Sequence, residues 1–205
     1  MFADTVLQID LPRDTRRSLQ RSRVDLRSGT RVAVALRPNP GDAMEQALLL
    51  ACKLARAYGL PVSLPAPGRL EELPRLAAIA LEQAGLTLPQ FEFVIEAGTV
   101  AFASPEALQA LRTLRNRGYG LALAGMMAVH GRLLDHLPVT AVIVSHVAVD
   151  ALSVARSAAV DIRDVAASVA ARGLNVVAPD VDTEARRAAL AGLGCHQGEG
   201  ALFSG

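Results

Sequence analysis

Short runs of apolar residues recur along the chain, each bounded by proline, glycine or charged residues. Runs such as "AVIVS" (141–145) and "NVVAP" (175–179) are apolar at successive positions, so both faces of a strand formed there would be buried. This pattern is typical of parallel strands covered by helices. The predicted strands are 31–38, 60–66, 91–97, 119–125, 139–145 and 174–179, and one more strand is expected toward each end of the chain.

Between these runs the apolar residues follow a helical period, and capping residues indicate where helices begin and end. Ser104 is expected to cap one helix, with Pro105 in its first turn and Gly118 at its close. Asp42 and Gly59 are expected to bound another helix in the same way. The predicted helices are 41–59, 68–85, 104–118, 127–137, 150–173 and 182–194.

Strands that alternate with helices over this length predict an α/β fold, either a closed barrel or a doubly wound sheet. The chain contains neither GxGxxG nor GxxxxGK[ST], so the nucleotide-binding doubly wound folds lack their usual signature. We therefore predict a TIM-like (β/α)8 barrel, for which 205 residues is a short chain.

Composition restricts the classes of partner and compartment. Hydrophobic residues make up 51% of the chain, so a large core can form, and the net charge of +1 gives no general attraction to nucleic acid or to an anionic membrane. No basic and apolar leader opens the chain, and no uncharged stretch approaches the roughly 20 residues of a membrane-spanning helix. A cytoplasmic protein is expected, with Cys52 and Cys195 as reduced thiols because their spacing is not that of a metal site.

Barrel enzymes carry their chemistry at the carboxyl ends of the strands. Here the carboxylates in such places are Glu96, Asp180 and Glu199, on strands that are not adjacent. A metal-dependent hydrolase needs several oxygen ligands that converge on the ion. The favoured interpretation is therefore that these are polar loop residues facing water. Other residues at or beyond the strand ends are Arg37, Asn39, Pro65, Ala124, Gly125, Ser145, His146, Pro179, His196 and Gln197.

Two further interpretations of these strand ends stay open. One is a rearranged metal site in a divergent enzyme, which would use Asp180, Asp182, His146 and His196. The other is a residual small-ligand pocket, which would consist of Arg37, Glu96, His146 and Asp180. No GxSxG motif occurs, and neither cysteine has a basic partner nearby in the sequence, so no nucleophile is predicted.

Several stretches carry ordered landmarks from about residue 21 to the end of the chain. They are "VDLRSGTRVAVAL" (24–36), "EQALLLACKLA" (45–55), "SPEALQALRTLRNRGYGLALAG" (104–125), "LPVTAVIVS" (137–145) and "GLNVVAPDVDTEARRAALAGLGCHQGEGALFSG" (173–205). In order and spacing they resemble the EAL domain, the cyclic di-GMP phosphodiesterase family of bacterial signalling. The resemblance implies a lead-in over 1–20 and an EAL-type barrel over 21–205 that is shortened in its first third.

The family's functional positions fall mostly on residues that cannot perform the family's chemistry. The resemblance places the glutamate of the namesake motif on Val34, the metal-binding glutamate of the fourth strand near Val94, and the aspartate pair on Ala124 and Gly125. Without oxygen ligands a hard divalent cation is not held. The remaining family positions fall on Leu64 or Pro65, Ile143, Ser145, Pro179 and Glu199, with Arg21 in place of a glutamine on the first strand.

The resemblance therefore implies a degenerate EAL-like protein with no catalytic residue, no metal and no cofactor. By analogy with inactive members of the family, we expect a regulator that binds another protein, with a homodimer as one form. Cyclic di-GMP is not expected to bind. The alternative is a sensor that binds cyclic di-GMP or another small ligand without hydrolysing it.

Three features bear on how such a partner would bind. Met126 and Met127 are expected to fill the space of the former metal site rather than form an adaptable surface. The predicted helix 150–172 has apolar residues on more than one face, which we expect to pack in the core: Val154, Ala158, Ile162, Val165 and Val169. The third feature is an arginine-rich segment, favoured as a solvated lead-in: Arg13, Arg16, Arg17, Arg21, Arg23, Arg27 and Arg31.

Overall fold

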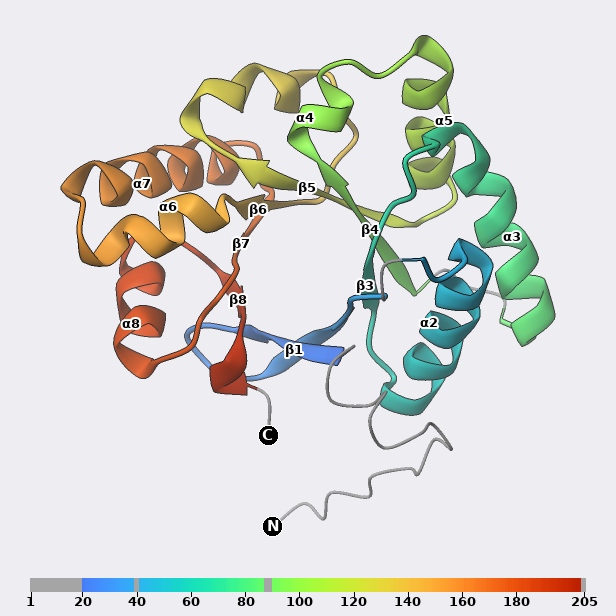
Figure 1. Ribbon diagram of the computed structural model, residues 1–205, viewed down its shortest axis with the longest axis horizontal. Helices are drawn as coiled ribbons and strands as arrows, with labels where there is room; N and C mark the ends of the chain where they lie inside the picture. The colour runs from blue at the N-terminus through green and yellow to red at the C-terminus, as the bar shows by residue number, and fades with distance from the viewer. Residues whose placement is uncertain (1–19, 39–40, 87–89, 204–205) are drawn as a thin grey trace.

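A computed structural model describes residues 20–38, 41–86 and 90–203 of the chain. Eight strands close into a barrel in the order of the sequence (Figure 1), which confirms the predicted TIM-like fold. Strands β2 to β8 run parallel to one another, while β1, which lies between β2 and β8, is antiparallel to both. The strands are β1 Gln20–Asp25, β2 Arg31–Leu36, β3 Val62–Pro65, β4 Phe91–Glu96, β5 Gly120–Met126, β6 Ala141–Val144, β7 Asn175–Ala178 and β8 Gln197–Glu199.

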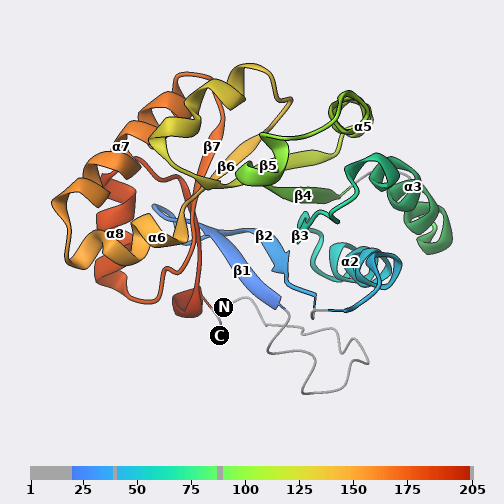
Figure 2. The same cartoon turned by 45° about the horizontal axis from the view of Figure 1, so that its top comes forward.

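Helices surround the barrel on the outside, and α6, α7 and α8 lie together on the side opposite α2 and α3 (Figures 1 and 2). The long helices cover the outward faces of the parallel strands, as the doubly apolar strand pattern predicts. The α-helices are α2 Met44–Tyr58, α3 Leu73–Ala84, α4 Ala97–Val100, α5 Pro105–Asn116, α6 His146–Asp150, α7 Arg156–Ala170 and α8 Glu184–Gly192. The 3-10 helices are η1 Leu70–Glu72, η2 Ala128–Asp135, η3 Ala151–Ser153 and η4 Ala201–Phe203.

A capping side chain explains where α5 begins, whereas α2 begins without one. Ser104 accepts a hydrogen bond from the backbone N–H of Ala107, and Pro105 stands in the first turn of α5, as predicted. The prediction that Asp42 caps the first helix is wrong. The residue in that place is Ala43, which offers no side-chain cap, and α2 is closed at its other end by Gly59 in the left-handed conformation.

The strand pair β1–β2 is joined by a tight turn that Asp25 organises. One oxygen of its carboxylate accepts hydrogen bonds from the backbone N–H groups of Arg27 (3.0 Å) and Ser28 (2.7 Å) and from the Ser28 hydroxyl (3.0 Å). Gly29 follows with a φ of 74°, a conformation that a glycine adopts at little cost. The turn closes the barrel because it places β1 between β2 and β8.

Asp25→Ala is expected to lower the free energy of unfolding by about 1 kcal/mol near neutral pH, because the turn loses its acceptor. The hydrogen bonds from Ser28 lower the pKa of the Asp25 carboxyl below its ordinary value. Its contribution is therefore present above the unfolded-state pKa and is lost as the pH falls through the folded-state pKa. Urea denaturation at neutral and at acidic pH measures this. A deficit of the alanine variant that does not shrink in acid would contradict the prediction.

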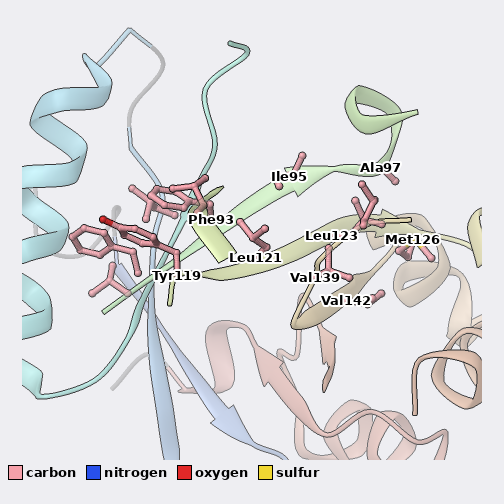
Figure 3. Close-up of a cluster of buried hydrophobic side chains, with 14 of the residues drawn as sticks. Phe93, Ile95, Ala97, Tyr119, Leu121, Leu123, Met126, Val139 and Val142 are labelled. Carbon is pink, nitrogen blue, oxygen red and sulfur yellow. The ribbon is translucent and has the colours of Figure 1, made fainter. Parts of the chain in front are cut away.

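The outward faces of the strands and the inner faces of the helices form the main hydrophobic core. At its β4–β5 end three aromatic rings meet (Figure 3): Phe93 lies 5.6 Å from Tyr119, and Phe91 lies 6.2 Å from both, between ring centroids. Leu121, Leu123 and Met126 continue this buried row along β5. The three aromatic rings supply bulk in a core that is otherwise built mainly from Leu, Val, Ile and Ala.

The two methionines do not fill the barrel interior. Met126 belongs to the outer core, where it is 2% exposed, and Met127 is 43% exposed. The prediction that both occupy a former metal cavity is therefore wrong. The cause is an irregularity of β5 between Leu123 and Met126, with Gly125 at a φ of 74°, which turns Met126 outward.

The predicted range 150–173 contains the 3-10 helix η3 and the long helix α7, with a break between them. Its four apolar positions from Ala158 to Val169 are buried, but Val154 is 86% exposed, so its assignment to the core is wrong. The chain leaves helical geometry at Ala155, where φ is −132° and ψ is 118°. Val154 therefore lies in the connection and not on the buried face of α7.

The lead-in over 1–20, with Arg13, Arg16 and Arg17, lies outside the described residues except for its last position. Arg27 and Arg31 are exposed, and the Arg31 guanidinium stacks 5.7 Å from the ring centroid of Tyr58. Within the described residues, no helix has the length and apolar character needed to cross a membrane.

Candidate functional site

Strand register decides which residues face the barrel interior. The Ser63 side chain faces the barrel interior, where its hydroxyl accepts a hydrogen bond from the buried Arg23 guanidinium. Ala35 pairs with Ser63 in the β2–β3 ladder and therefore faces the same way. Side chains alternate along a strand, so Val34 and Leu64 face outward into the main core. The assignment of family functional positions to Val34 and Leu64 is thus one residue out of register. The inward residues are Ala35 and Pro65, and neither side chain has a ligand atom.

The interior beside β4 to β7 is filled with small and branched apolar side chains. Ala124 and Ile143, two of the predicted lost positions, belong to this inner cluster. Val94, a third, packs against it from β4. Ser145 and Pro179 come directly after the ends of β6 and β7, two residues beyond Ile143 and Val177, and so continue their inward side. The complete inner cluster is Ala122, Ala124, Ala141, Ile143 and Val177, with Val94 packed against it.

Gly125 lies under the side chain of Glu96. A Cβ atom at Gly125 would stand 3.1 Å from Oε2 of Glu96, and the φ of 74° further restricts what residue fits there. Glu96 pairs in register with Ala124 at the carboxyl end of β4 and is exposed. The carboxylate therefore lies over the mouth of the barrel at a place where its neighbours offer no second ligand.

A buried ionic network occupies the other part of the interior. Arg23 donates to three partners: its Nε to Oε1 of Glu199 (2.6 Å), its Nη1 to Oε1 of Glu92 (2.5 Å) and its Nη2 to Oγ of Ser63 (2.9 Å). The Ser63 hydroxyl donates in turn to the same Glu92 oxygen (3.0 Å). The Arg23 side chain is 2% exposed and that of Glu199 5%. Four strands, β1, β3, β4 and β8, are thereby joined through one guanidinium.

The electrostatics of this network favour the charged state of the Arg23 guanidinium. Burial alone would lower the pKa of Arg23, but Glu199 and Glu92 outweigh that effect and raise it. Arg37 approaches Oε2 of Glu199 at 3.7 Å and adds a second positive charge. The buried carboxylates are thus compensated by guanidinium groups and not by a metal ion.

This network was missed by the sequence interpretation. Arg23 was grouped with a solvated lead-in and Glu199 with polar loop residues facing water, and both interpretations are wrong because the two residues are buried against each other. The available signal was Glu92, a charged residue within the strand-like run "FEFVIE". Its partner could not be found from sequence, because Arg23 and Glu199 are 176 residues apart.

At the mouth of the barrel the structure brings together part of the predicted pocket. His146 bonds through Nδ1 to Oδ2 of Asp180, and Arg21 lies 3.7 Å from the other Asp180 oxygen. Asp180 has a φ of 53°, a left-handed conformation that aspartate tolerates better than most residues. Arg37 faces Glu199 instead, and within the described part of the chain Glu96 forms no ion pair with Arg37, His146 or Asp180. The four residues predicted as a pocket therefore divide into separate contacts.

The alternative metal site is not assembled. Its His196 precedes β8, where its Nδ1 accepts from the backbone N–H of Val176, toward the opposite end of the barrel from Asp180. Across the ranges that the structure describes, no three His, Cys, Asp or Glu side chains converge as ligands. The inward side chains of Ala35, Pro65, Val94, Ala124, Ile143 and Pro179 have no ligand atom. Since Glu96 and Asp180 at the mouth belong to no converging set of ligands in the described residues, the residues present do not fit a divalent ion.

Neither cysteine has the surroundings of a nucleophile. Cys52 and Cys195 are buried free thiols, as predicted for reduced cysteines. Burial raises the pKa of Cys52 and raises that of Cys195 to about 12, so both are held as neutral thiols near neutral pH.

Together the fold and the interior define a TIM-like α/β barrel in which one antiparallel strand completes the closure. The sequence model of the EAL domain matches residues 44–205, and the chain belongs to the EAL domain family. A search of curated proteins found no match.

Solved EAL structures superpose on nearly the whole chain. The PaMucR phosphodiesterase in its c-di-GMP complex is 19% identical, with a TM-score of 0.77 over 90% of this chain and 94% of that one. The EAL domain of Mycobacterium smegmatis DcpA is 22% identical, with a TM-score of 0.77 and 91% of each chain covered. The FimX EAL domain from Pseudomonas aeruginosa bound to c-di-GMP is 17% identical, with a TM-score of 0.76 over 91% and 88%. At these identities the likeness establishes the fold alone.

Proposed function

We propose that this chain is a catalytically inactive EAL domain that acts as a protein-binding regulator in bacterial signalling. The observation that carries the proposal is the inner cluster around Ala124 and Ile143, which fills the strand ends with side chains that have no ligand atom. Hydrolysis of a phosphodiester by this family requires divalent ions to supply hydroxide and polarise the phosphate. We therefore propose that the domain has no phosphodiesterase activity.

The test is an assay of cyclic di-GMP hydrolysis by the purified protein with Mg²⁺ or Mn²⁺, beside an active EAL enzyme as positive control. We expect no turnover above the rate without protein, and no stoichiometric metal in the purified sample by elemental analysis. Turnover that depends on the divalent ion would overturn the proposal, and so would one bound ion per chain.

The alternative is a sensor that binds cyclic di-GMP or another anionic ligand without hydrolysing it. It is favoured by Arg21 and Arg37, whose side chains are 41% and 44% exposed beside Asp180 and Glu199 at the barrel mouth. Isothermal titration separates the two functions. We expect no heat of binding with cyclic di-GMP, with or without divalent ions, whereas micromolar affinity would establish the sensor.

The partner is proposed to be another protein, with a second copy of the chain as one form, in the cytoplasm. Support comes from the near-zero net charge of +1, which provides no general attraction to nucleic acid or to an anionic membrane. A link to cyclic di-GMP signalling or motility control is part of the proposal and depends on family membership.

A further inference from the structure

Two adjoining apolar cavities lie outside the barrel, between α7 and the segments α6 and η2. The larger, about 150 Å³, and the smaller, about 100 Å³, share Met126, Met127 and Val165. We call the combined feature the methionine groove. Its α7 side runs from Ser157 to Val169, and its other side contains Val147, Ala148 and Ala151 beside the first cavity and Leu134 beside the second.

The groove has an open apolar rim. Val147 is 76% exposed and Met127 43%, while Met126 and Val165 form a buried floor. Exposed apolar side chains around a concave apolar surface are typical of a protein-binding site and not of a free surface. Methionine is suited to such a groove because its flexible thioether adapts to the side chain that enters.

The charged side chains that line the groove are both acidic. Asp161 lines the first cavity and Asp164 the second, three residues apart on one flank of α7. No lysine, arginine or histidine is among the lining residues that the structure describes. Arg172, beyond the end of α7, is held by Asp135 at 2.6 Å and by Ser168, and among the residues that the structure describes no ion pair compensates Asp161 or Asp164. An occupant must therefore combine apolar side chains with positive charge.

The length of the groove fits one helix. From Ser157 to Val169 the lining residues of α7 span 13 residues, which is about 18 Å along a helix axis, or between three and four turns. An amphipathic helix laid in such a groove places anchors at i, i+3 or i+4, and i+7. A basic residue at the edge of its apolar stripe would then meet Asp161 or Asp164.

We infer that the methionine groove binds a basic amphipathic helix of a partner protein, with apolar side chains seated over Met126 and Met127 and a lysine or arginine beside Asp161 and Asp164. This deepens the proposed function, since it names the surface and the chemistry of the regulated partner. The occupant is a different protein, because α7 itself carries Asp161 and Asp164 toward the groove and a symmetric second copy would bring like charges near each other.

The test is a display selection against the full chain. The library consists of helical peptides about three turns long, in which all surface positions of the peptide are randomised. Binders retained by the wild type are counter-selected on Val147→Glu, which places a charge on the apolar rim. We expect the survivors to have leucine, isoleucine, phenylalanine or methionine at helical spacing and at least one basic residue at the stripe edge. Two outcomes would overturn the inference: selected peptides that contain no basic residue, or a library in which every peptide that binds the wild type also binds Val147→Glu.

Affinity measurements on the selected peptide separate the two parts of the recognition. By fluorescence anisotropy, Val147→Glu and the double variant Asp161→Lys/Asp164→Lys are each expected to weaken binding at least about tenfold. Phe102→Glu is the matched control: Phe102 is 91% exposed and lines neither cavity, so its substitution should leave affinity unchanged. Equal weakening by all three variants would mean nonspecific apolar binding and would overturn the inference.

Two further readouts distinguish the failures. Light scattering shows whether the chain dimerises in a manner abolished by Val147→Glu. Such a dimer would identify a second copy as the occupant and overturn the choice of a different protein. The hydrolysis assay is run on the same preparation: turnover with peptide binding intact would refute the proposed function alone, and absence of peptide binding without turnover would refute the groove alone.

Discussion

Arg23→Met is expected to lower the free energy of unfolding by about 3–5 kcal/mol, because it leaves the buried Glu199 and the part-buried Glu92 without their shared guanidinium. Glu199 and Glu92 each lose a charge-assisted hydrogen bond, and Ser63 loses a donor to its hydroxyl. Methionine has similar length and keeps apolar contacts, so the loss comes mainly from charge. Urea denaturation monitored by circular dichroism measures it.

The pH dependence of the same variant has a defined sign. Uncompensated buried carboxylates have folded-state pKa values above the unfolded ones, so the folded state binds more protons and gains stability as the pH falls. The deficit of Arg23→Met should therefore be smaller at about pH 5 than near pH 8. Arg27→Met, at an exposed position of the β1–β2 turn, is the control and should change stability by less than about 0.5 kcal/mol.

The triple variant Arg23→Met/Glu92→Gln/Glu199→Gln should recover much of the lost stability, because no charge remains buried. If Arg23→Met were no more damaging than Arg27→Met, the network would contribute nothing to the fold. If the triple variant were as unstable as the single one, packing rather than charge would be the cause.

Gly200→Ala is expected to cost about 3 kcal/mol or more, because the added methyl group would collide with backbone. A Cβ atom there would stand 2.3 Å from both N and O of Val181 and 2.5 Å from its carbonyl carbon. These backbone atoms have little freedom, since the Val181 N–H donates to the Glu199 carbonyl (2.9 Å) and the Val181 carbonyl accepts from Leu202 (3.2 Å). Thermal unfolding measures the loss.

A matched substitution isolates the steric cause. Gly192 is the last residue of α8, and a Cβ atom there would meet no atom within 4 Å. Gly192→Ala should therefore leave stability unchanged or raise it by about 0.5 kcal/mol, through the better helix propensity of alanine. A melting temperature of Gly200→Ala equal to that of Gly192→Ala would show that β8 can move away from Val181, against the prediction.

Most of the fold could be predicted because its signals are local. Strand runs that are apolar at successive positions and a cap such as Ser104 depend only on neighbours in the sequence, and the structure places the elements near where those signals stand. Boundaries moved where a local rule was outweighed: Asp42 gives way to Ala43 as the capping position, and Val154 leaves the helix because Ala155 is extended.

The candidate site was predicted less completely, because register is not local. Val94, Ala124 and Ile143 face the interior, whereas Val34 and Leu64 face the outer core and the inward positions beside them are Ala35 and Pro65. A one-residue slip moves a side chain to the other face of a strand, since side chains alternate with a period of two. The pairing of Ala35 with Ser63, together with the hydrogen bond that Arg23 donates to the Ser63 hydroxyl, settles which face of β2 and β3 is inward.

Through its resemblance to the EAL domain, the sequence placed Ala124 and Gly125 where that family has an aspartate pair, and the identity of these side chains does not depend on the fold. It also determined the alternation that leads to a closed barrel. Only the tertiary structure decided that Arg23, Glu92 and Glu199 neutralise one another inside that barrel, and that Met127 and Val147 open onto a groove with Asp161. Those contacts join residues distant in sequence, and burial, charge compensation and concavity arise only when the chain has closed on itself.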